Sequence, residues 1–521
     1  MIPFEQLTVE QKLGRVLCAR VVELGDNLDF TLEMIKQQAV GCVQVTINGK
    51  AKETIARLRE AADYPLLIIN DMERGYPLSG LPSVPLLSLA ACSDPTYARV
   101  FAAGVAKHAM ADGYNGCWGP VLDILYQDGP CRVARTASDT PEGVLRLARE
   151  INRVFRSYGF LGTGKHYPGG ADKSMDTHMV EGISYDTEEQ LLKSSLVPYL
   201  ELMKEGLLTA IMVGHTLFPN IDPDYPASLS KKVIDIIRRQ GYDGLIYTDS
   251  LAMMGILQKY GEKNAMALAL MAGNDIILPN YRTPMREVWQ MMRDAYREGL
   301  ITDEALDAAV RRVMQAEQLS ITPVPNPYPL PDNAAEILEA VARDSMTALC
   351  DEGVTSAIDP QARCLFVVMT SQDYTGEDNA AEISEKTWYS PAAVKAAIAE
   401  RFPQAEIVTI PEFPDQRQNE KVLTAATRHS EVVFVTYCNT SPYLGTDGLT
   451  RRVESVINAL SLSGKLEAVV HFGNPLALCP LLPIPRRIFG YSAPAAQHYA
   501  FDVLAGRLEA RGKMPFPRLM K

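Results

Sequence analysis

The chain of 521 residues lacks any apolar run near the roughly 20 residues that a membrane-spanning helix needs. Its first twelve residues also lack the basic start and the apolar core of a signal peptide. We therefore expect a soluble protein of the cytoplasm that has no membrane partner.

Cysteine pairs of the Cys-x-x-Cys type are missing as well. The nine cysteines are scattered along the chain, which disfavours a cysteine-based zinc knuckle or a thioredoxin-like motif. Cys42 and Cys364 lie within apolar runs, where a thiol behaves as a small hydrophobic group. We expect reduced cysteines in a reducing compartment, with no metal and no cofactor.

A long basic run is also absent, and 51 Lys and Arg against 63 Asp and Glu give a net charge of −12. This balance argues against a nucleic-acid partner or an anionic membrane surface. An acidic surface fits a neutral or cationic small molecule but selects none. The length and the hydrophobic content of 47% predict two large domains and give no oligomeric state.

Short apolar runs alternate with helical patterns over the first 320 residues. The candidate strands are residues 15–22, 41–47, 65–71, 116–123, 162–167, 210–215, 244–249 and 275–278. Parallel strands need a covering helix at each crossover, and eight strand–helix units close a barrel. We therefore predict an α/β fold with a (β/α)₈ TIM-type barrel over residues 1–320.

Helical spacing of apolar residues fills the segments between these strands. The candidate helices are residues 95–111, 143–157, 188–204, 231–239, 265–272, 285–297 and 302–320. Asp94 and Thr140 each precede a proline suited to a first helical turn, so we expect both side chains to cap a helix.

Residues 321–335 are rich in proline and predict a semi-rigid linker. Beyond it, candidate strands alternate with helices again. The strands are residues 363–369, 406–410, 431–437, 466–472 and 487–489, and the helices include residues 391–401 and 451–461. Residues 336–521 therefore predict a second, smaller α/β sandwich domain.

Polar side chains stand where the predicted barrel strands end, which is where such barrels carry their active sites. They are Asp71 after the third strand, Lys165 and His166 at the fifth, His215 at the sixth and Asp249 at the seventh. A carboxylate at the barrel mouth can serve glycosidic cleavage, as a nucleophile or by stabilising an oxocarbenium-like transition state. For Asp249 the alternative is a cap for the next helix.

The segment after the fifth strand holds Asp176 and His178, two residues apart. In an extended loop these side chains share one side, so the carboxylate can fix the imidazole tautomer and raise its basicity. The pair is typical of an acid/base dyad, although a solvated Asp and His would show the same spacing.

Lys165-His166-x-Pro168-Gly169 followed by Asp176-Thr177-His178 resembles the Lys-His-Phe-Pro-Gly-His-Gly-x₄-Asp-Ser-His signature of family 3 glycoside hydrolases. The resemblance is to their β-N-acetylglucosaminidase branch. Further similar segments are residues 70–73, 211–215, 226–230 and 247–253. The resemblance covers residues 1–320, and the downstream segment looks like the second domain of the family.

The resemblance implies a role for each candidate residue. Asp249 would be the nucleophile, and His178 would be the acid/base partnered by Asp176. The sugar would be bound by Asp71, Arg135, Lys165 and His166, with His215 lining the same rim. The chain departs from the family pattern at three positions: Gly170 replaces a His, Arg74 a Gly and Ser79 an Arg.

Together these residues predict a retaining exo-glycosidase that hydrolyses terminal β-linked N-acetylhexosamine, in particular N-acetylglucosamine, through a covalent glycosyl-enzyme intermediate. A β-glucosidase or a β-N-acetylglucosaminide phosphorylase of the same family remains open. From other classes, a metal-dependent barrel hydrolase and a non-catalytic sugar-binding protein remain alternatives.

Overall fold

The computed structural model describes residues 2–21, 26–126, 135–170, 179–322, 325–370, 389–438 and 448–520. The chain forms two compact units. The barrel unit comprises Met1–Ser83, Ala98–Gly129 and Thr136–Ala334, and the sandwich unit comprises Val84–Tyr97, Pro130–Arg135 and Ala335–Lys521.

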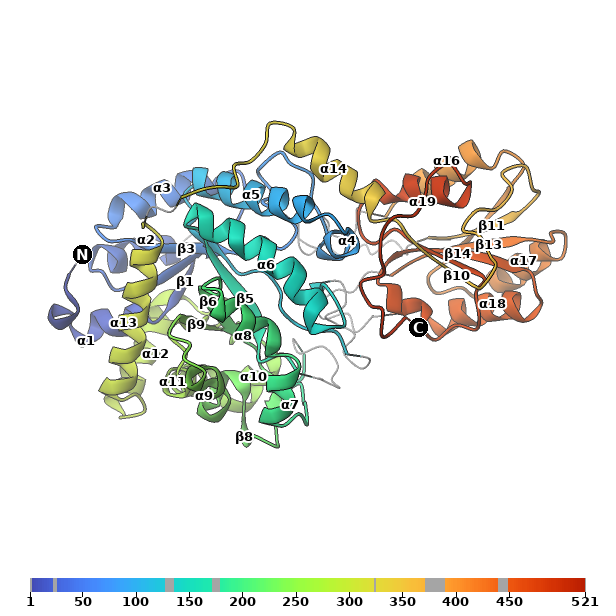
Figure 1. Cartoon of the computed structure of the whole chain (residues 1–521). Helices are drawn as coiled ribbons and strands as arrows, with labels where there is room; N and C mark the ends of the chain where they lie inside the picture. Colours follow the sequence, from blue (N-terminus) through green and yellow to red (C-terminus); the bar gives the residue numbers. More distant parts are fainter. Residues whose placement is uncertain are drawn as a thin grey trace. The chain divides into compact units, whose positions relative to one another are not determined.

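Seven parallel strands form the sheet of the barrel unit, in the order β1-β2-β3-β4-β5-β6-β9 (Figure 1). They are β1 Cys18–Val21, β2 Cys42–Val45, β3 Leu67–Asn70, β4 Gly116–Cys117, β5 Leu161–Tyr167, β6 Ala210–Val213 and β9 Leu245–Thr248. Each lies inside a predicted strand, except β5, which begins one residue before the predicted start.

Residues 275–278 close the ring without forming a regular strand. Ile276 pairs with Tyr247 of β9, and Ile277 pairs with Leu17, next to β1. This segment therefore supplies the eighth position of the barrel through single residue pairs. The prediction of an α/β barrel is confirmed, while the predicted eighth strand is a bridging segment.

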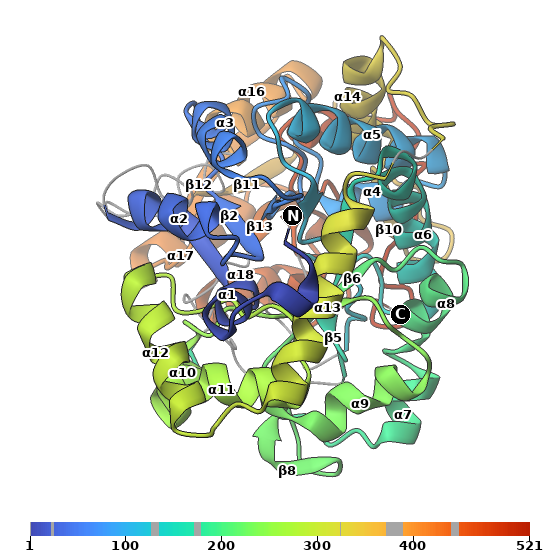
Figure 2. The ribbon, with the colours of Figure 1, turned by 90° about the vertical axis from the view of Figure 1, so that its left-hand side faces the viewer.

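Helices surround these strands in the view along the barrel (Figure 2). They are α1 Val9–Arg15, α2 Asp26–Lys36, α3 Ala51–Ala61, α5 Pro95–Ala111, α6 Pro141–Tyr158, α7 Glu188–Lys193, α8 Val197–Lys204, α9 Lys231–Arg239, α10 Met254–Tyr260, α11 Glu262–Ala272, α12 Met285–Arg297 and α13 Asp303–Leu319. Helix α13 lies across the near end in Figure 2, and its Val313 and Ala316 pack on the apolar interior of the strands.

Capping side chains begin the helices where the sequence places them. The Thr140 side chain accepts from the amide of Gly143, and Asp94 accepts from the amide of Thr96 at 2.8 Å. The predicted helix over residues 188–204 is wrong as one element, because it breaks into α7 and α8. Pro198 lies in the first turn of α8, where a residue without an N–H begins a helix but does not continue one.

Six strands form the sheet of the sandwich unit, in the order β10-β15-β14-β13-β11-β12. They are β10 Thr347–Cys350, β11 Leu365–Thr370, β12 Glu406–Pro411, β13 Val432–Cys438, β14 Leu466–Gly473 and β15 Arg486–Phe489. Pairs within the sheet are parallel except that β10 runs antiparallel to β15.

Two layers of helices cover this sheet. Helices α16 Pro391–Arg401 and α19 Ala496–Leu504 lie on one face in Figure 1, and α17 Gln416–Ala426 and α18 Arg451–Leu462 lie on the other. Helix α14 Ala334–Asp344 leads into β10, and α4 Leu86–Ala91 belongs to this unit although it lies early in the chain. The Ala91 carbonyl accepts from the amide of Lys513 at 2.9 Å, which ties α4 to the end of the chain.

The proline-rich segment lies on the barrel unit. The Ser157 hydroxyl donates to Asn326 Oδ1 at 3.1 Å, and the Tyr158 hydroxyl donates to the Tyr328 carbonyl at 3.2 Å. The end of α6 therefore holds this segment.

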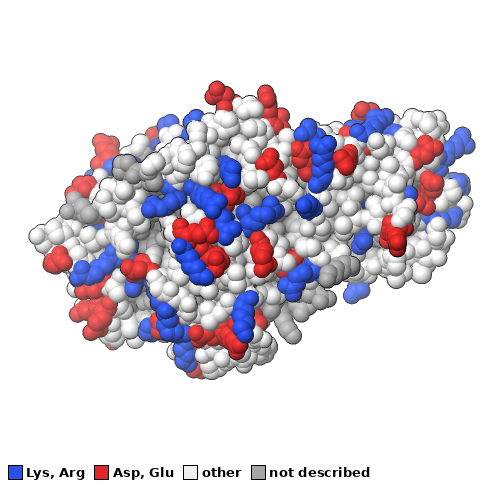
Figure 3. Space-filling view, viewed as in Figure 1, with Lys and Arg blue, Asp and Glu red and all other residues white. Residues whose placement is uncertain are grey.

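Basic and acidic side chains interleave on the face shown in Figure 3. Arg99 on α5 pairs with Glu150 on α6 at 2.5 Å, and Arg149 on α6 pairs with Glu205, just after α8, at 2.7 Å. None of the described helices combines the length and the apolar composition that crossing a membrane requires.

Candidate active site

The barrel brings five of the predicted site residues to the carboxyl ends of its strands. Asp71 directly follows β3 and Asp249 directly follows β9. Lys165 and His166 are the two residues before the last residue of β5, and His215 lies two residues after β6. Because these strands are parallel neighbours, their ends share one rim. The distances below show which of these side chains meet.

Lys165 is a buried cation held by two carboxylates. Its side chain is 2% exposed, and Nζ lies 2.6 Å from Asp71 Oδ1 and 2.6 Å from Glu73 Oε1. A buried ammonium needs such compensation, because losing its hydration costs several kcal/mol. The Asp71 side chain remains half exposed.

His166 lies between two further carboxylates. Nδ1 is 2.7 Å from Asp123 Oδ2, and Nε2 is 3.9 Å from Asp249 Oδ2. Successive residues of a regular strand point to opposite faces. Here the pairing of β5 with β6 is irregular, because its register shifts between Lys165 and Tyr167. Lys165 and His166 are consecutive, yet both side chains contact carboxylates at the rim.

Asp249 is held as a carboxylate. Burial raises the pKa of this group, but the charges of His166, His215 and Lys165 lower it, as does the amide of Ser250, and the net shift is below the usual value. The Ser250 amide donates to Oδ1 at 2.7 Å, and the side chain keeps 22% of its surface exposed. An ionised, oriented and accessible carboxylate is what a nucleophile at a sugar carbon requires.

Both ring nitrogens of His215 bind protein groups. Nδ1 lies 2.7 Å from Ser228 Oγ, and Nε2 lies 3.0 Å from the carbonyl oxygen of Ser250. The residue is buried, so this geometry favours a role in holding the turn after Asp249 over direct contact with a sugar.

Three predicted site residues are not placed at this rim. Asp176 and His178 lie outside the described residues. Arg135 is half-buried and belongs to the sandwich unit, so its part in sugar binding stays a prediction.

The departure from the family pattern at Gly170 has a steric cause. Gly170 has φ of +100°, and a Cβ there would lie 2.8 Å from Cε1 of Phe218. Phe218 comes from the short strand β7 Leu217–Phe218, which pairs with β8 Asp222–Pro226. The ring therefore fills the space that a side chain at position 170 would need.

Sequence reasoning missed two carboxylates of the site. Glu73 shares Lys165 with Asp71, and Asp123 holds His166. Both carried a signal that could have been used, because Glu73 stands two residues after Asp71 and Asp123 ends the predicted fourth strand. Within the described part of the chain, no three His, Cys, Asp or Glu residues are grouped so that they could hold a metal.

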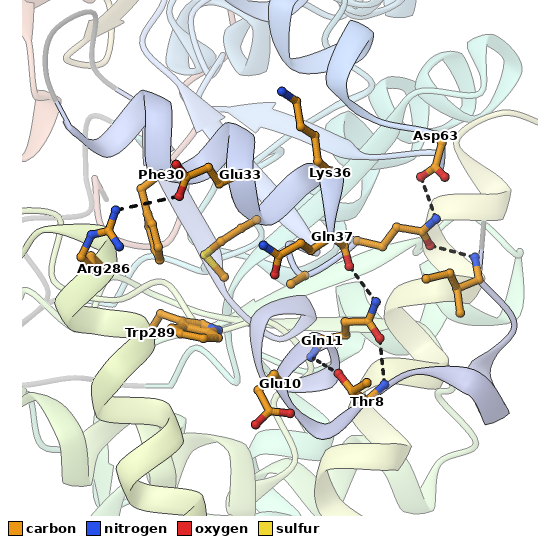
Figure 4. Close-up of a pocket in the computed structure, with 14 residues that line it drawn as sticks. Thr8, Glu10, Gln11, Phe30, Glu33, Lys36, Gln37, Asp63, Arg286 and Trp289 are labelled. Carbon is orange, nitrogen blue, oxygen red and sulfur yellow. Dashed lines mark hydrogen bonds and ion pairs between the residues drawn. The ribbon is translucent and has the colours of Figure 1, made fainter.

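A cavity of about 600 Å³ lies elsewhere on the barrel unit, among α1, α2 and α12 (Figure 4). Gln11 donates from Nε2 to the Gln37 carbonyl at 2.8 Å on one side, and Phe30 meets Trp289 edge to face on the other. None of the strand-end residues lines it, so this cavity is separate from the rim that carries Asp249.

Comparison with known families gives one match that covers most of the chain. The model of the glycosyl hydrolase family 3 N terminal domain matches residues 5–316. This range contains the whole set of predicted site residues.

Relatives similar in sequence carry the names of glycosidases. A β-N-acetylglucosaminidase/β-glucosidase of Cellulomonas fimi is 26% identical over 323 residues, which is 58% of this chain and 56% of that protein. A β-hexosaminidase of Tolumonas auensis is 30% identical over 233 residues, which is 43% of this chain and 69% of that protein. The chain thus spans little more than half the length of the Cellulomonas relative.

Solved structures match over nearly the whole chain. A family 3 β-N-acetylglucosaminidase from a Paenibacillus species has a TM-score of 0.77 at 26% identity, covering 98% of this chain and 99% of that one. A β-glucoside phosphorylase has a TM-score of 0.80 at 21% identity, covering 99% of this chain and 96% of that one, and shares the fold.

Proposed function

Because the chain belongs to glycoside hydrolase family 3, we propose that it is a retaining exo-glycosidase acting on terminal β-linked N-acetylhexosamine, in particular N-acetylglucosamine. The observation that carries this proposal is the ionised Asp249 carboxylate at the rim, beside His166 and close to the charge of Lys165. The names of the Cellulomonas, Tolumonas and Paenibacillus relatives support the choice of sugar.

In the first step, Asp249 attacks the anomeric carbon. A bond forms between a carboxylate oxygen and this carbon while the bond to the leaving oxygen breaks. His178, oriented by Asp176, gives its proton to the departing oxygen. The product is a covalent glycosyl-enzyme and a free alcohol.

In the second step, water replaces Asp249 at the same carbon. Neutral His178 accepts a proton from the water as it attacks, and the bond to Asp249 breaks. Two inversions at one carbon retain the β configuration. Asp71, Lys165, His166 and Arg135 hold the sugar through both steps, and His215 supports the turn that carries Asp249.

A panel of 4-nitrophenyl β-glycosides, each with and without phosphate, tests this proposal. We expect much faster release of nitrophenol from the N-acetylglucosaminide than from the glucoside, with free sugar as the product in both buffers. Equal or faster turnover of the glucoside would identify a β-glucosidase, and a sugar 1-phosphate would identify a phosphorylase. If the natural protein turns over no glycoside faster than an Asp249→Ala control does, the protein binds sugars without cleaving them.

A further inference from the structure

Asp123 is a buried carboxylate that the mechanism above does not use. It is 1% exposed and lies beyond β4, on the side of His166 away from Asp249. Oδ2 lies 2.7 Å from His166 Nδ1, and Oδ1 accepts from the backbone amide of His166 at 3.2 Å. Both oxygens of one carboxylate are thus bound to one residue.

These two contacts fix the imidazole ring. The hydrogen bond from the His166 backbone amide fixes the position of the Asp123 carboxylate. The hydrogen bond between this carboxylate and Nδ1 then fixes the orientation of the imidazole ring. Because an ionised carboxylate only accepts hydrogen bonds, Nδ1 must carry a proton. Which atom of a histidine faces a reaction is set by the hydrogen bond that its other nitrogen makes. Nε2 is therefore the nitrogen turned toward Asp249, at 3.9 Å.

We propose that Asp123 is a positioning residue, which holds His166 with Nδ1–H bound to its carboxylate and so presents Nε2 to the nucleophile and the sugar. This inference rests on the proposed function of the rim. In its neutral form, the ring held in this way offers Nε2 as an acceptor for a sugar hydroxyl beside Asp249, and in its charged form it contributes to the lowered pKa of Asp249. The opposite tautomer would place an N–H there and leave two acceptors facing each other at Asp123.

Other charged groups at the rim do not supply this orientation. The Lys165 ammonium is bound by Asp71 and Glu73. His215 is bound by Ser228 and by the carbonyl of Ser250. Among the described contacts of His166, Asp123 is the partner at Nδ1 and Asp249 is the nearest acidic group at Nε2.

The variant Asp123→Asn tests the inference, because it keeps the shape of the side chain but adds an N–H that can donate to Nδ1. In an aspartate–histidine pair of a catalytic site, this replacement selects the wrong tautomer and lowers kcat by up to about 10⁴-fold. We expect kcat to fall at least about 100-fold while KM changes little. Asp222→Asn is the matched control, since Asp222 is also buried and accepts from Ser230 Oγ at 2.6 Å, away from His166.

Nitrogen NMR of histidine-labelled enzyme reads the tautomer directly and needs no turnover. At a pH where the ring is neutral, the His166 signal should show Nδ1–H in the natural enzyme and Nε2–H in Asp123→Asn. An Nε2–H tautomer in the natural enzyme would overturn the inference even if the variant failed to fold. A kcat in Asp123→Asn within about threefold of the natural value would also overturn it. The spectrum reports the tautomer of His166 without any substrate. It can therefore refute the role of Asp123 independently of the glycoside assays, which test the proposed activity.

Discussion

At the scale of single residues, the charges of His166, His215 and Lys165 explain why the rim can hold an ionised nucleophile. Lys165 and two histidines stand among four carboxylates: Asp71, Glu73, Asp123 and Asp249. Asp71 and Glu73 both contact the Lys165 ammonium. Asp123 and Asp249 lie near the two ring nitrogens of His166. The low pKa of Asp249 follows from this arrangement despite its burial.

Removing the nucleophile and removing the acid should have different signatures. We expect Asp249→Ala to abolish turnover of every substrate. We expect His178→Ala to lose about 10²–10⁴-fold on an unactivated disaccharide but far less on a 2,4-dinitrophenyl glycoside, whose leaving group needs no proton. Initial rates on the two substrates provide the comparison. If His178→Ala loses the same factor on both, another residue is the acid.

Lys165→Met should move the acidic limb of the kcat/KM profile to higher pH. The Lys165 charge is one of the groups that lower the pKa of Asp249, so its removal makes ionisation of the nucleophile harder. Activity would then be lost at a higher pH during acidification. Lys193→Met, which breaks an exposed pair with Glu189, is the control and should leave the limb in place. A limb that stays or moves to lower pH in Lys165→Met contradicts this reading.

The sequence was sufficient to predict that the polar residues at the strand ends lie at one rim of the barrel. Asp71, Lys165, His166 and Asp249 come to one rim because the strand pattern puts them there. The spacing could have marked Glu73 and Asp123 as candidates, but it could not give their partners, because which carboxylate turns toward which basic group depends on tertiary packing. The ring of Phe218 fills the space beside Gly170. This contact joins residues 48 positions apart in the chain, so it also could not be predicted from local sequence.

At the scale of elements, local signals explain the accurate predictions. Helices α5, α9 and α12 begin and end where the sequence predicts, and the first of these has its polar cap and proline at the predicted place. The errors arise where tertiary context decides. Arg15, predicted in the first strand, ends α1, and the short edge strand β10 escaped notice because most of its residues are half exposed.

Asp275 anchors the segment that closes the barrel. Its buried carboxylate accepts from Arg238 Nη2 at 2.9 Å, from Arg312 Nη1 at 3.0 Å and from the amide of Ile246 at 2.8 Å. Breaking a buried pair by removing one partner costs about 3–5 kcal/mol. We expect Asp275→Asn to lower the free energy of unfolding by about 3 kcal/mol in urea titrations.

Asp243→Asn is the control for this prediction. Asp243 pairs with the same Arg312 at 3.2 Å but is 76% exposed. Exposed pairs contribute about 0–1 kcal/mol, so this variant should stay within about 1 kcal/mol of the natural protein. Equal losses in the two variants would show that Asp275 does not anchor the closure.

At the scale of the whole molecule, a buried ion pair joins the first and the last α-helix of the barrel unit, α1 and α13. Arg15 Nη1 donates to both oxygens of Glu317, at 2.9 and 2.7 Å, although 302 residues separate them. Both side chains are fully buried. The pair links α1 to α13 beside the amino ends of the strands, opposite the rim that carries Asp249.

This pair should make stability depend on pH. Burial raises the pKa of Glu317 to about 7, against the lowering effect of Arg15. An unfolded glutamate titrates near 4.3. A raised pKa favours the protonated form in the folded state, so its stabilisation is present below about pH 4.3 and is lost as pH rises through about 7.

We therefore expect the melting temperature of the natural protein to fall between pH 5 and pH 8 more than that of Glu317→Gln, which cannot titrate. Thermal unfolding at several pH values measures the difference between the two curves. Glu420→Gln, an exposed change on α17, is the control and should follow the natural protein. Parallel curves for the natural protein and Glu317→Gln would contradict the prediction.

The central claim is that Asp249 forms a covalent bond to the anomeric carbon. A 5-fluoro-N-acetylglucosaminyl fluoride tests it directly, because the ring fluorine slows both steps while the fluoride leaving group keeps the first step faster than the second. Peptide mapping by mass spectrometry of the treated enzyme should find the sugar on Asp249, and Asp249→Ala should remain unlabelled. A label on any other residue, or steady turnover with no labelled peptide, would contradict the account.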